Sequence, residues 1–320
     1  MARVRVAVMG AGEFGRRHLR AIRQSAKAEL VGVYDTDGER AAAAAAEFEC
    51  RAFGDAGEWA GKVDAAVVAT PTTTHGEVGQ ALLEAGIDVL VEKPISHDLG
   101  IARRLVETAK RHGRILQIGH LERFNPAVTA LESHLTTPLF FEVHRLSVFT
   151  PRSLDVDVVL DLMIHDLDIL LSMVKAAPEE IRAAGISILS PKVDIANVRL
   201  AFAGGCVANL TASRVSTERV RKLRLFQPNE YVSLDYARQE VSFFRVSPGR
   251  QIGFHPLVVL KEEPLRLEQE AFFECVEERT RPRVAGEDGC LALEVALAIL
   301  AKIEEHSRVV ADSLAKVRKP

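Results

Sequence analysis

The stretch VAVMGAGEFGRRHL, residues 6 to 19, decides the fold of the first part of the chain. A β-branched run leads into Gly10, Gly12 and Gly15, which have the GxGxxG spacing, and a helical pattern follows at once. Glycines in this context allow a tight turn, a close backbone approach to a pyrophosphate and close helix packing. Free N–H groups at the start of the helix can then bind the phosphates. The stretch predicts a dinucleotide site formed by Gly10, Gly12, Glu13, Phe14 and Gly15.

An acidic residue 20 positions after Gly15 indicates which dinucleotide binds. Asp35 ends the run ELVGVYD, where a carboxylate accepts hydrogen bonds from the adenosine ribose hydroxyls and repels a 2′-phosphate. Thr36 and Asp37 follow it, so neither of the next two positions is basic. The sequence therefore favours NAD over NADP as the cofactor.

Short β-branched runs alternate with helical patterns from residue 4 to about residue 120. Helices are expected at 13–25, 38–47, 75–86 and 98–112. This alternation predicts a doubly wound parallel sheet, a Rossmann domain over residues 1–122.

The pattern changes after about residue 125. One helix is expected at 159–174, several strands between 180 and 246, and closing helices near 266–280 and 288–306. These elements predict an α+β domain over residues 123–320 with a largely antiparallel open sheet. The fold class of the whole chain is then α/β. An uncovered sheet face commonly pairs with a second copy, so we expect a homodimer or homotetramer.

Composition excludes several classes of protein. At 320 residues with 48% hydrophobic and 27% charged residues, the chain has room for two packed domains. A net charge of -3 gives no electrostatic reason to expect nucleic acid as a partner. Because we see neither a secretory signal nor an apolar run long enough to span a membrane, we expect a cytoplasmic protein. The four cysteines are scattered and form no CxxC pair, which is typical of reduced thiols.

The apolar stretch VVLDLMIHDLDILL, residues 158 to 171, contains four titratable side chains. If the helix turns about 100° per residue, Asp161, His165 and Asp168 share a face roughly 60° wide, and Asp166 points elsewhere. This arrangement is compatible with a catalytic acid/base set, a metal site or a structural ion pair.

Two further stretches end strands at the sheet edge where open α/β folds bind ligands. VEKPIS, residues 91 to 96, places Glu92 and Lys93 there as further cofactor-binding residues, with Lys93 partly desolvated by its apolar neighbours. ATPTTTH, residues 69 to 75, places Thr70 and Pro71 against the cofactor. His75 is expected either to contact the cofactor or only to begin the next helix.

The order and spacing of GAGEFG, Asp35, ATPTTTH, VEKPIS and DLMIHDLD resemble the Gfo/Idh/MocA family of sugar and polyol oxidoreductases over essentially the whole chain. The resemblance implies that His165 takes the hydroxyl proton as hydride leaves for nicotinamide, that Asp161 orients His165, and that Lys93 hydrogen-bonds the reacting oxygen. It leaves open which of Lys93 and His165 passes the proton.

GHLERFNPAV at 119–128 and TASRVSTERVRKLRLF at 211–226 are most similar to a subgroup that oxidises the 3-hydroxyl of UDP-N-acetylglucosamine. This implies a UDP-sugar substrate and a keto product for an aminotransferase, in lipid A or surface-glycan synthesis. Arginine forks can hold a diphosphate; for Arg219, Arg221 and Arg224 an exposed, charged strand is the alternative. The substrate residues expected on this basis are Glu122, Arg123, Asn125 and Arg214.

Other functions stay open from the sequence. Asp155 and Asp157 stand where many family members have glycines, which departs from a simple inositol- or glucose-type pocket. A metal-dependent hydrolase would use Asp161, His165, Asp168 and His120 as ligands, but it leaves the dinucleotide site without a role. The remaining alternatives are dehydrogenation of a free sugar or inositol, an NAD-dependent glycosidase on the same fold, and a sensor without turnover.

Overall fold

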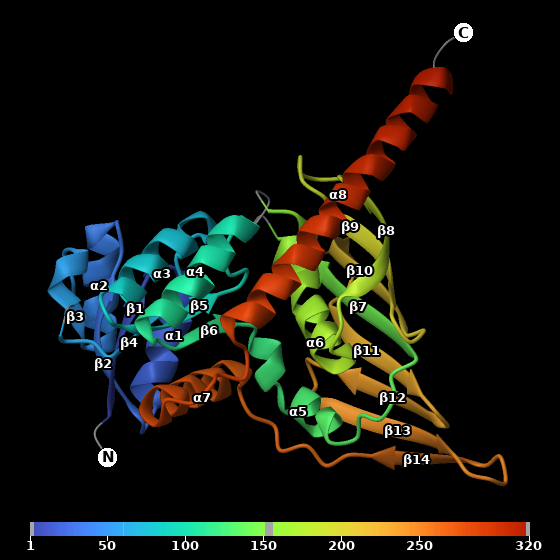
Figure 1. Cartoon of the computed structure of the whole chain (residues 1–320), viewed down its shortest axis with the longest axis horizontal. Coiled ribbons are helices and arrows are strands. Elements are labelled where there is room, and N and C mark those ends of the chain that lie inside the picture. The colour runs from blue at the N-terminus through green and yellow to red at the C-terminus, as the bar shows by residue number, and fades with distance from the viewer. Residues whose placement is uncertain (1–2, 60, 151–155, 318–320) are drawn as a thin grey trace. The chain divides into compact units, whose positions relative to one another are not determined.

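The structure is a computed structural model that describes residues 3–59, 61–150 and 156–317. The chain forms two compact units, Met1–Phe124 with Glu262–Cys290, and Asn125–Lys261 with Leu291–Pro320 (Figure 1). The sequence indicated one division after residue 122. In the structure the segment 262–290 returns to the first unit, because Phe272, Phe273 and Val276 are buried in that unit's core.

The first unit is a parallel six-stranded sheet with strand order β3-β2-β1-β4-β5-β6, which confirms the predicted Rossmann fold. Its strands are β1 (Val4–Met9), β2 (Ala28–Tyr34), β3 (Arg51–Ala52), β4 (Ala65–Val68), β5 (Asp88–Glu92) and β6 (Leu116–Gly119). Its helices are α1 (Glu13–Gln24), α2 (Gly38–Phe48), α3 (His75–Glu84), α4 (Leu99–His112) and α7 (Pro264–Glu278), with short 3₁₀ turns η1 (Ala56–Trp59), η2 (Thr72–Thr74) and η3 (Leu121–Phe124). α3 packs with α4, whereas α1 packs with α2 and α7 (Figure 1).

Local sequence explains these boundaries. β4 and β5 are buried along their whole length, as their continuous apolar runs require in a parallel sheet. Asp37 and Asp98 cap α2 and α4 by accepting backbone N–H bonds from Arg40 and Ile101. α4 ends at Gly113, which has a left-handed conformation.

The second unit contains an eight-stranded sheet in the order β14-β13-β12-β11-β7-β10-β9-β8. All neighbours are antiparallel except β7 and β10, which confirms a largely antiparallel sheet. Its strands are β7 (Phe140–Val148), β8 (Pro178–Ile186), β9 (Ile195–Phe202), β10 (Val207–Ser216), β11 (Val220–Gln227), β12 (Glu230–Asp235), β13 (Glu240–Val246) and β14 (Ile252–Pro256). Neither β7 nor β14 was expected. In β7 the buried Arg145 interrupts the apolar side of the alternation.

The core of this unit lies between the sheet and its helices. The helices are α5 (Pro126–Glu132), the π-helical turn η4 (Val159–Met163), α6 (Ile164–Val174) and α8 (Gly286–Val317), whose first residues belong to the first unit. Apolar residues of α6 and α8 pack on residues from β7 and β9 to β13. Among the helices of the described ranges, none combines the length and apolarity needed to cross a bilayer.

Candidate active site

The cofactor-binding stretches converge on one cavity of about 630 Å³ in the first unit. It opens where β1, β2 and β4 end, and at this point the strand order reverses, which is where doubly wound sheets bind ligands. Of the residues predicted to bind the cofactor, the structure places seven in the lining: Gly10, Gly12, Glu13, Phe14, Asp35, Thr70 and Pro71.

The glycine loop fits a dinucleotide pyrophosphate. Gly10 has a φ of +102°, and a Cβ there would lie 2.5 Å from the carbonyl oxygen of Ala69. A Cβ at Gly15 would lie 1.8 Å from the Gly10 oxygen, so Gly15 allows α1 to pack on the loop. A Cβ at Gly12 would meet no atom within 4 Å, and Gly12 caps α1 without a side chain. The first N–H groups of α1 therefore face a position that a phosphate can occupy.

The adenosine end of the cavity carries a charge pair. Asp35 accepts backbone N–H bonds from Ala11 at 2.8 Å and from Asp37 at 2.9 Å. Arg40, from the first turn of α2, lies 3.6 Å from the Asp35 carboxylate and also lines the cavity. The cation that the sequence did not show directly after Asp35 is thus supplied five positions later.

His75 begins α3 and is buried outside the cavity lining. Its ring nitrogens lie 2.9 Å from the carbonyl oxygens of Pro94 and Thr70. Burial lowers the pKa of His75, which favours the neutral ring. A neutral ring donates to only one of these two oxygens, so His75 hydrogen-bonds one of the loops after β4 and β5 and packs against the other. This surrounding is closer to the helix-start prediction than to direct cofactor contact.

Glu92 and Lys93 stand at the carboxyl end of β5. Glu92 is buried, and its carboxylate lies 2.8 Å from the ring of His18 on α1 and 3.2 Å from the backbone N–H of Lys93. The Lys93 side chain is half-buried. Lys93 therefore follows β5 directly, at the edge of the sheet where open α/β folds bind ligands.

The turn η3 carries the predicted residues Glu122 and Arg123. Glu122 is buried, and Arg123 is half-buried and donates to the Arg283 carbonyl at 3.4 Å. The preceding His120 is buried, and this burial lowers its pKa to about 3, with the charges of Lys93 and Arg123 acting in the same direction. His120 is therefore neutral at working pH.

In the second unit, Asp161 and His165 lie at a change of helix type. Asp161 is in the π-helical turn η4, and His165 is the second residue of α6. A π-turn changes the rotation per residue, so the uniform wheel of 100° does not describe this stretch. Both side chains are half-buried, whereas Asp166 and Asp168 are buried.

Asp166 forms a structural ion pair. Its two oxygens accept from Arg145 on β7 at 2.6 and 2.8 Å, and both side chains are 2% exposed. The Arg145 guanidinium also lies 5.1 Å from the Tyr236 ring centre. The structural ion pair considered for this stretch therefore exists, but it uses Asp166.

Other predicted substrate residues make structural contacts. Asn125 caps α5 by accepting from Ala127, and it donates to the Tyr236 carbonyl. Arg214 is 5% exposed, lies 3.7 Å from the Asp194 carboxylate and donates to the Val156 carbonyl. These contacts favour a structural part for both side chains.

The remaining arginines and acids considered from sequence differ in their surroundings. Arg224 pairs with Glu142 at 3.0 Å, and Arg219 is exposed. Asp157 accepts from the Val193 N–H at 2.9 Å, whereas Asp155 lies outside the described residues.

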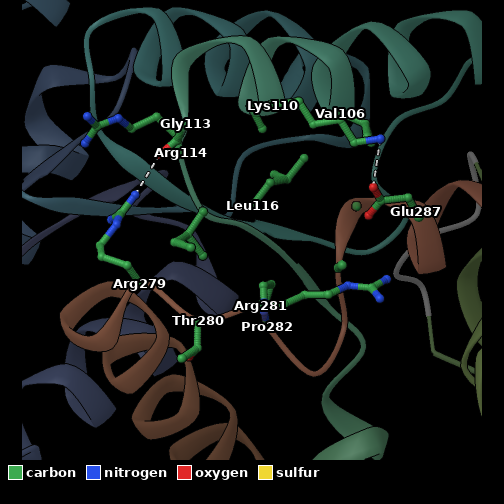
Figure 2. A pocket seen from close by; sticks show the side chains of 14 residues that line it. Val106, Lys110, Gly113, Arg114, Leu116, Arg279, Thr280, Arg281, Pro282 and Glu287 are labelled. Atoms are coloured by element: carbon green, nitrogen blue, oxygen red, sulfur yellow. Dashed lines mark hydrogen bonds and ion pairs between the residues drawn. The ribbon is translucent and has the colours of Figure 1, made fainter.

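A second cavity of about 400 Å³ lies at the amino end of β6, beside the α7–α8 connection (Figure 2). Lys110 and Glu287 pair across it at 3.0 Å, and Arg279 donates to the Gly113 carbonyl. It is at the opposite end of the strands from Lys93, where this fold is not expected to bind ligands. In the part of the chain that the structure describes, no group of His, Cys, Asp and Glu is arranged to hold a metal ion.

Two residues that contact predicted site residues were not expected from sequence, Arg40 and His18, and neither was Gln269, which contacts His18. A sequence signal for His18 did exist, because it is a polar residue on the apolar side of an amphipathic helix, three positions after Gly15. The structure shows that it is buried there. Gln269 gave no local signal, because its contact with His18 spans 251 positions.

The chain is similar to known proteins over both of its units. A family model described as "Oxidoreductase family, NAD-binding Rossmann fold" matches residues 4–120, and one described as "GFO/IDH/MocA C-terminal domain" matches residues 127–227. The UDP-N-acetylglucosamine 3-dehydrogenase of Acidithiobacillus ferrooxidans is 36% identical over 310 residues, which cover 95% of this chain and 98% of that protein. The inositol 2-dehydrogenase of Rhizobium meliloti is 25% identical over 327 residues, covering 96% and 98%.

The fold of the chain is also similar to that of solved structures. The A. ferrooxidans enzyme superposes with a TM-score of 0.90 at 35% identity, covering 95% of this chain and 99% of that one. An oxidoreductase from Agrobacterium radiobacter in complex with NAD⁺, L-tartaric acid and magnesium has a TM-score of 0.84 at 16% identity, covering 95% and 97%, which supports the fold alone. From the family matches, the full-length similarity and the glycine loop together, the chain belongs to the Gfo/Idh/MocA family of oxidoreductases and is a dehydrogenase with an NAD-binding Rossmann unit.

Proposed function

We propose that this dehydrogenase oxidises the 3-hydroxyl of UDP-N-acetylglucosamine to a ketone. The observation that carries the proposal is the 36% identity, over 95% of the chain, to a protein named for that reaction. The half-buried side chains of Lys93, Asp161 and His165 are compatible with it. NAD⁺ bound in the 630 Å³ cavity supplies the hydride acceptor.

In this mechanism His165 removes the proton of the reacting hydroxyl. Imidazole suits the task because the free side chain titrates near neutral pH. Asp161 orients the ring, and the Lys93 ammonium donates a hydrogen bond to the oxygen as it becomes a carbonyl. Lys93 belongs to the first unit, and Asp161 and His165 belong to the second.

The substrate is tested by a coupled assay. Oxidation of a secondary alcohol by NAD⁺ is generally uphill at neutral pH, so an aminotransferase and glutamate are included to remove the ketone. A 3-amino nucleotide sugar is the expected product, identified by mass spectrometry. Faster turnover of free inositol or glucose than of UDP-N-acetylglucosamine would contradict the proposal.

The second candidate is a polyol dehydrogenase, favoured by the similarity to inositol 2-dehydrogenase over 96% of the chain. The same assay distinguishes it, because inositol then reduces NAD⁺ without any nucleotide. Release of a free sugar with no net change in NADH would instead indicate NAD-dependent glycoside hydrolysis.

Cofactor choice follows from Asp35 and Arg40. We propose that NAD is preferred because Asp35 accepts from the ribose hydroxyls and repels a 2′-phosphate. Asp35→Ala should weaken NAD binding and reduce the preference for NAD over NADP, because Arg40 then attracts the 2′-phosphate of NADP without an opposing carboxylate. Adding Arg40→Leu should then lower NADP affinity more than NAD affinity in titrations of the free enzyme. An unchanged affinity ratio in Asp35→Ala would make the acid structural.

For the diphosphate we propose Arg123 as the direct contact. Arg123→Ala should raise KM for UDP-N-acetylglucosamine and also lower kcat, since binding energy of the remote group positions the sugar. Arg214 is proposed to act through Asp194 and Val156, so Arg214→Ala should lower the free energy of unfolding. If Arg123→Ala leaves both kinetic constants unchanged, the diphosphate contact lies elsewhere.

The proposed product identifies the next step. A 3-keto sugar nucleotide is a substrate for transamination, so we propose coupling to an aminotransferase in lipid A or surface-glycan synthesis. NAD and UDP-sugars are both metabolites of the cytoplasm, and we therefore propose that the reaction takes place there.

We also propose that a second copy of the chain covers the sheet face opposite α6 and α8. An aromatic ladder crosses that face, with ring centres 4.9 to 5.7 Å apart, and Phe226 and Phe254 are 38% and 58% exposed. Isologous pairing of one face is the commonest route to a homodimer. Phe254→Asp should shift the sedimentation coefficient toward the monomer; a wild-type monomer would contradict the proposal. The ladder consists of Phe140, Phe226, Tyr231, Phe244 and Phe254.

A further inference from the structure

A buried hydrogen-bond chain leads from α7 to the turn that carries Lys93. The Gln269 amide nitrogen lies 2.6 Å from His18 Nδ1 and 3.3 Å from the His18 carbonyl oxygen. His18 Nε2 lies 2.8 Å from Glu92 Oε1, and Glu92 Oε2 accepts the Lys93 backbone N–H. His18 is 0% and Gln269 1% exposed, so water does not compete for these contacts.

The partners determine the direction of each hydrogen bond. A carbonyl oxygen only accepts, so the side of the amide that faces it is the nitrogen, which only donates. His18 Nδ1 must then accept from Gln269, and the ring proton is on Nε2. His18 is therefore a neutral donor to Glu92, which is an acceptor on both of its oxygens.

The Glu92 carboxylate is also confined from the side of β6. A Cβ at Gly119 would lie 2.9 Å from the carboxyl carbon and from both oxygens of Glu92. Beyond Lys93, the Pro94 carbonyl oxygen lies 2.9 Å from Nδ1 of the buried His75. The backbone on both sides of Lys93 is thus tied to buried groups.

We propose that His18 and Gln269 are positioning residues of the dehydrogenase, which fix Glu92 and through it the backbone from which Lys93 reaches the substrate. The inference rests on the proposed role of Lys93. It also gives a function to the return of segment 262–290 to the first unit, because α7 supplies Gln269. Phe14, which lines the cofactor cavity, packs edge-on against His18 with ring centres 5.3 Å apart.

Three variants disturb the chain at different points: His18→Leu, Gln269→Leu and Gly119→Ala. Each should lower kcat by about 10- to 100-fold, the cost of a small misplacement of a reacting group, while NAD affinity changes little. Gly119→Ala removes no buried polar group, so it tests the displacement of Glu92 in a folded protein. His18→Gln keeps an N–H toward Glu92 and should recover most of the loss.

The matched control is Gln117→Leu. Gln117 is buried on β6 and donates to the Glu268 carbonyl at 3.1 Å, so it also ties α7 to the sheet but does not contact Glu92. This variant should lower the free energy of unfolding and keep kcat within about twofold of wild type, as expected for a change outside the coupled set.

Lys93→Ala separates this inference from the proposed function. If Lys93→Ala turns over normally, the role of Lys93 is wrong. If Lys93→Ala is impaired, His18→Leu added to it should lower kcat no further, because residues that act through one another are not additive. Additive losses, or normal kcat in all three chain variants, would overturn the positioning role.

The tautomer is tested without turnover. Nitrogen-15 NMR of histidine-labelled protein, with His18→Gln to assign the signal, should show the His18 ring proton on Nε2 and an unprotonated Nδ1 under the conditions of the kinetic assay. A proton on Nδ1 would overturn the direction of the hydrogen-bond chain.

Discussion

The two units hold the side chains proposed to react in different ways. In the first, Lys93 follows a buried strand, His18 donates to the adjoining Glu92 carboxylate, and Gln269 in turn donates to His18. In the second, Asp161 and His165 lie on a π-helical turn, and the next residue, Asp166, forms a buried ion pair with Arg145. The first site is therefore fixed by regular backbone and hydrogen bonds, and the second by an irregular turn held by a full charge pair.

This difference has an energetic consequence. A hydrogen bond to a charged group contributes roughly 1.5–3 kcal/mol net, whereas breaking a buried ion pair leaves an uncompensated charge that costs about 3–5 kcal/mol. We therefore expect changes around Lys93 to act mainly on rate and changes around Asp166 to act mainly on stability.

The largest expected effect tests whether both sites take part in one reaction. Lys93→Ala and His165→Ala should each lower kcat by about 10²- to 10⁴-fold, the usual contribution of an acid/base group. NAD titration of each variant should give wild-type affinity, because neither residue lines the cofactor cavity. His112→Ala, an exposed histidine in the last turn of α4, is the control. Near-normal turnover of either variant would remove that residue from the mechanism.

The ion pair beside His165 should give the next largest effect. Asp166→Asn leaves Arg145 charged and buried, so the free energy of unfolding in urea should fall by about 3–5 kcal/mol. Lys302→Ala, which removes an exposed pair with Glu305, should cost no more than about 1 kcal/mol. Equal losses in the free energy of unfolding of the two variants would mean that the buried pair stabilises the protein no more than an exposed pair does.

The sequence describes the backbone of the first unit better than that of the second for a physical reason. The glycine loop acts through local backbone geometry, so spacing alone indicated the close approaches that the structure has at Gly10 and Gly15. The helical wheel assumes a constant rotation per residue, which η4 does not have, so it does not describe where Asp161 lies relative to His165. It still identified Asp166 as pointing away from the other three.

Long side chains and distant partners were the parts that could not be predicted. Arg214 has the fork expected for a diphosphate, but the same fork fits an internal carboxylate, and Asp194 lies beside it. Arg40 reaches Asp35 from the following helix rather than from the next residue. Gln269 meets His18 only because segment 262–290 returns to the first unit, which no local pattern indicates.

Acid should weaken the first unit earlier than the second. Burial lowers the pKa of His120 to about 3, so below about pH 6.5 the unfolded chain takes up a proton that the native state does not. The free energy of unfolding therefore falls as the pH is lowered below about 6.5, by about 1.36 kcal/mol for each pH unit. At pH 5 the loss reaches about 2 kcal/mol. In the second unit, burial opposes ionisation of Asp194, but N–H bonds from Ile188 and Leu189 outweigh it and lower its pKa to about 2.

Urea unfolding at several pH values tests this order. The fluorescence of the single tryptophan, Trp59, reports on unfolding of the first unit. The urea concentration at the midpoint of this transition should fall as the pH is lowered from about 6.5 to 5. Asp194 loses its contribution only below about pH 4, the ordinary range of aspartate. His120→Leu should flatten the dependence of the Trp59 transition, and an unchanged slope in that variant would assign the effect to other groups, such as His75.

The smallest expected effect separates the cofactor contact from the fold within the first unit. Gly12 and Gly38 both precede or begin a helix, and a Cβ at either would meet no atom within 4 Å. Neither has a positive φ, so Ala should be accepted at both positions with a change of less than about 1 kcal/mol in the stability of the free protein. Only Gly12 lines the cavity. Gly12→Ala should therefore weaken NAD binding by about tenfold, close to 1.4 kcal/mol, because the methyl group occupies space that the pyrophosphate needs, while Gly38→Ala binds NAD normally. Equal NAD affinity in the two variants would show that the phosphates do not approach Gly12, and the reading of the GxGxxG loop as a pyrophosphate cradle would then be wrong.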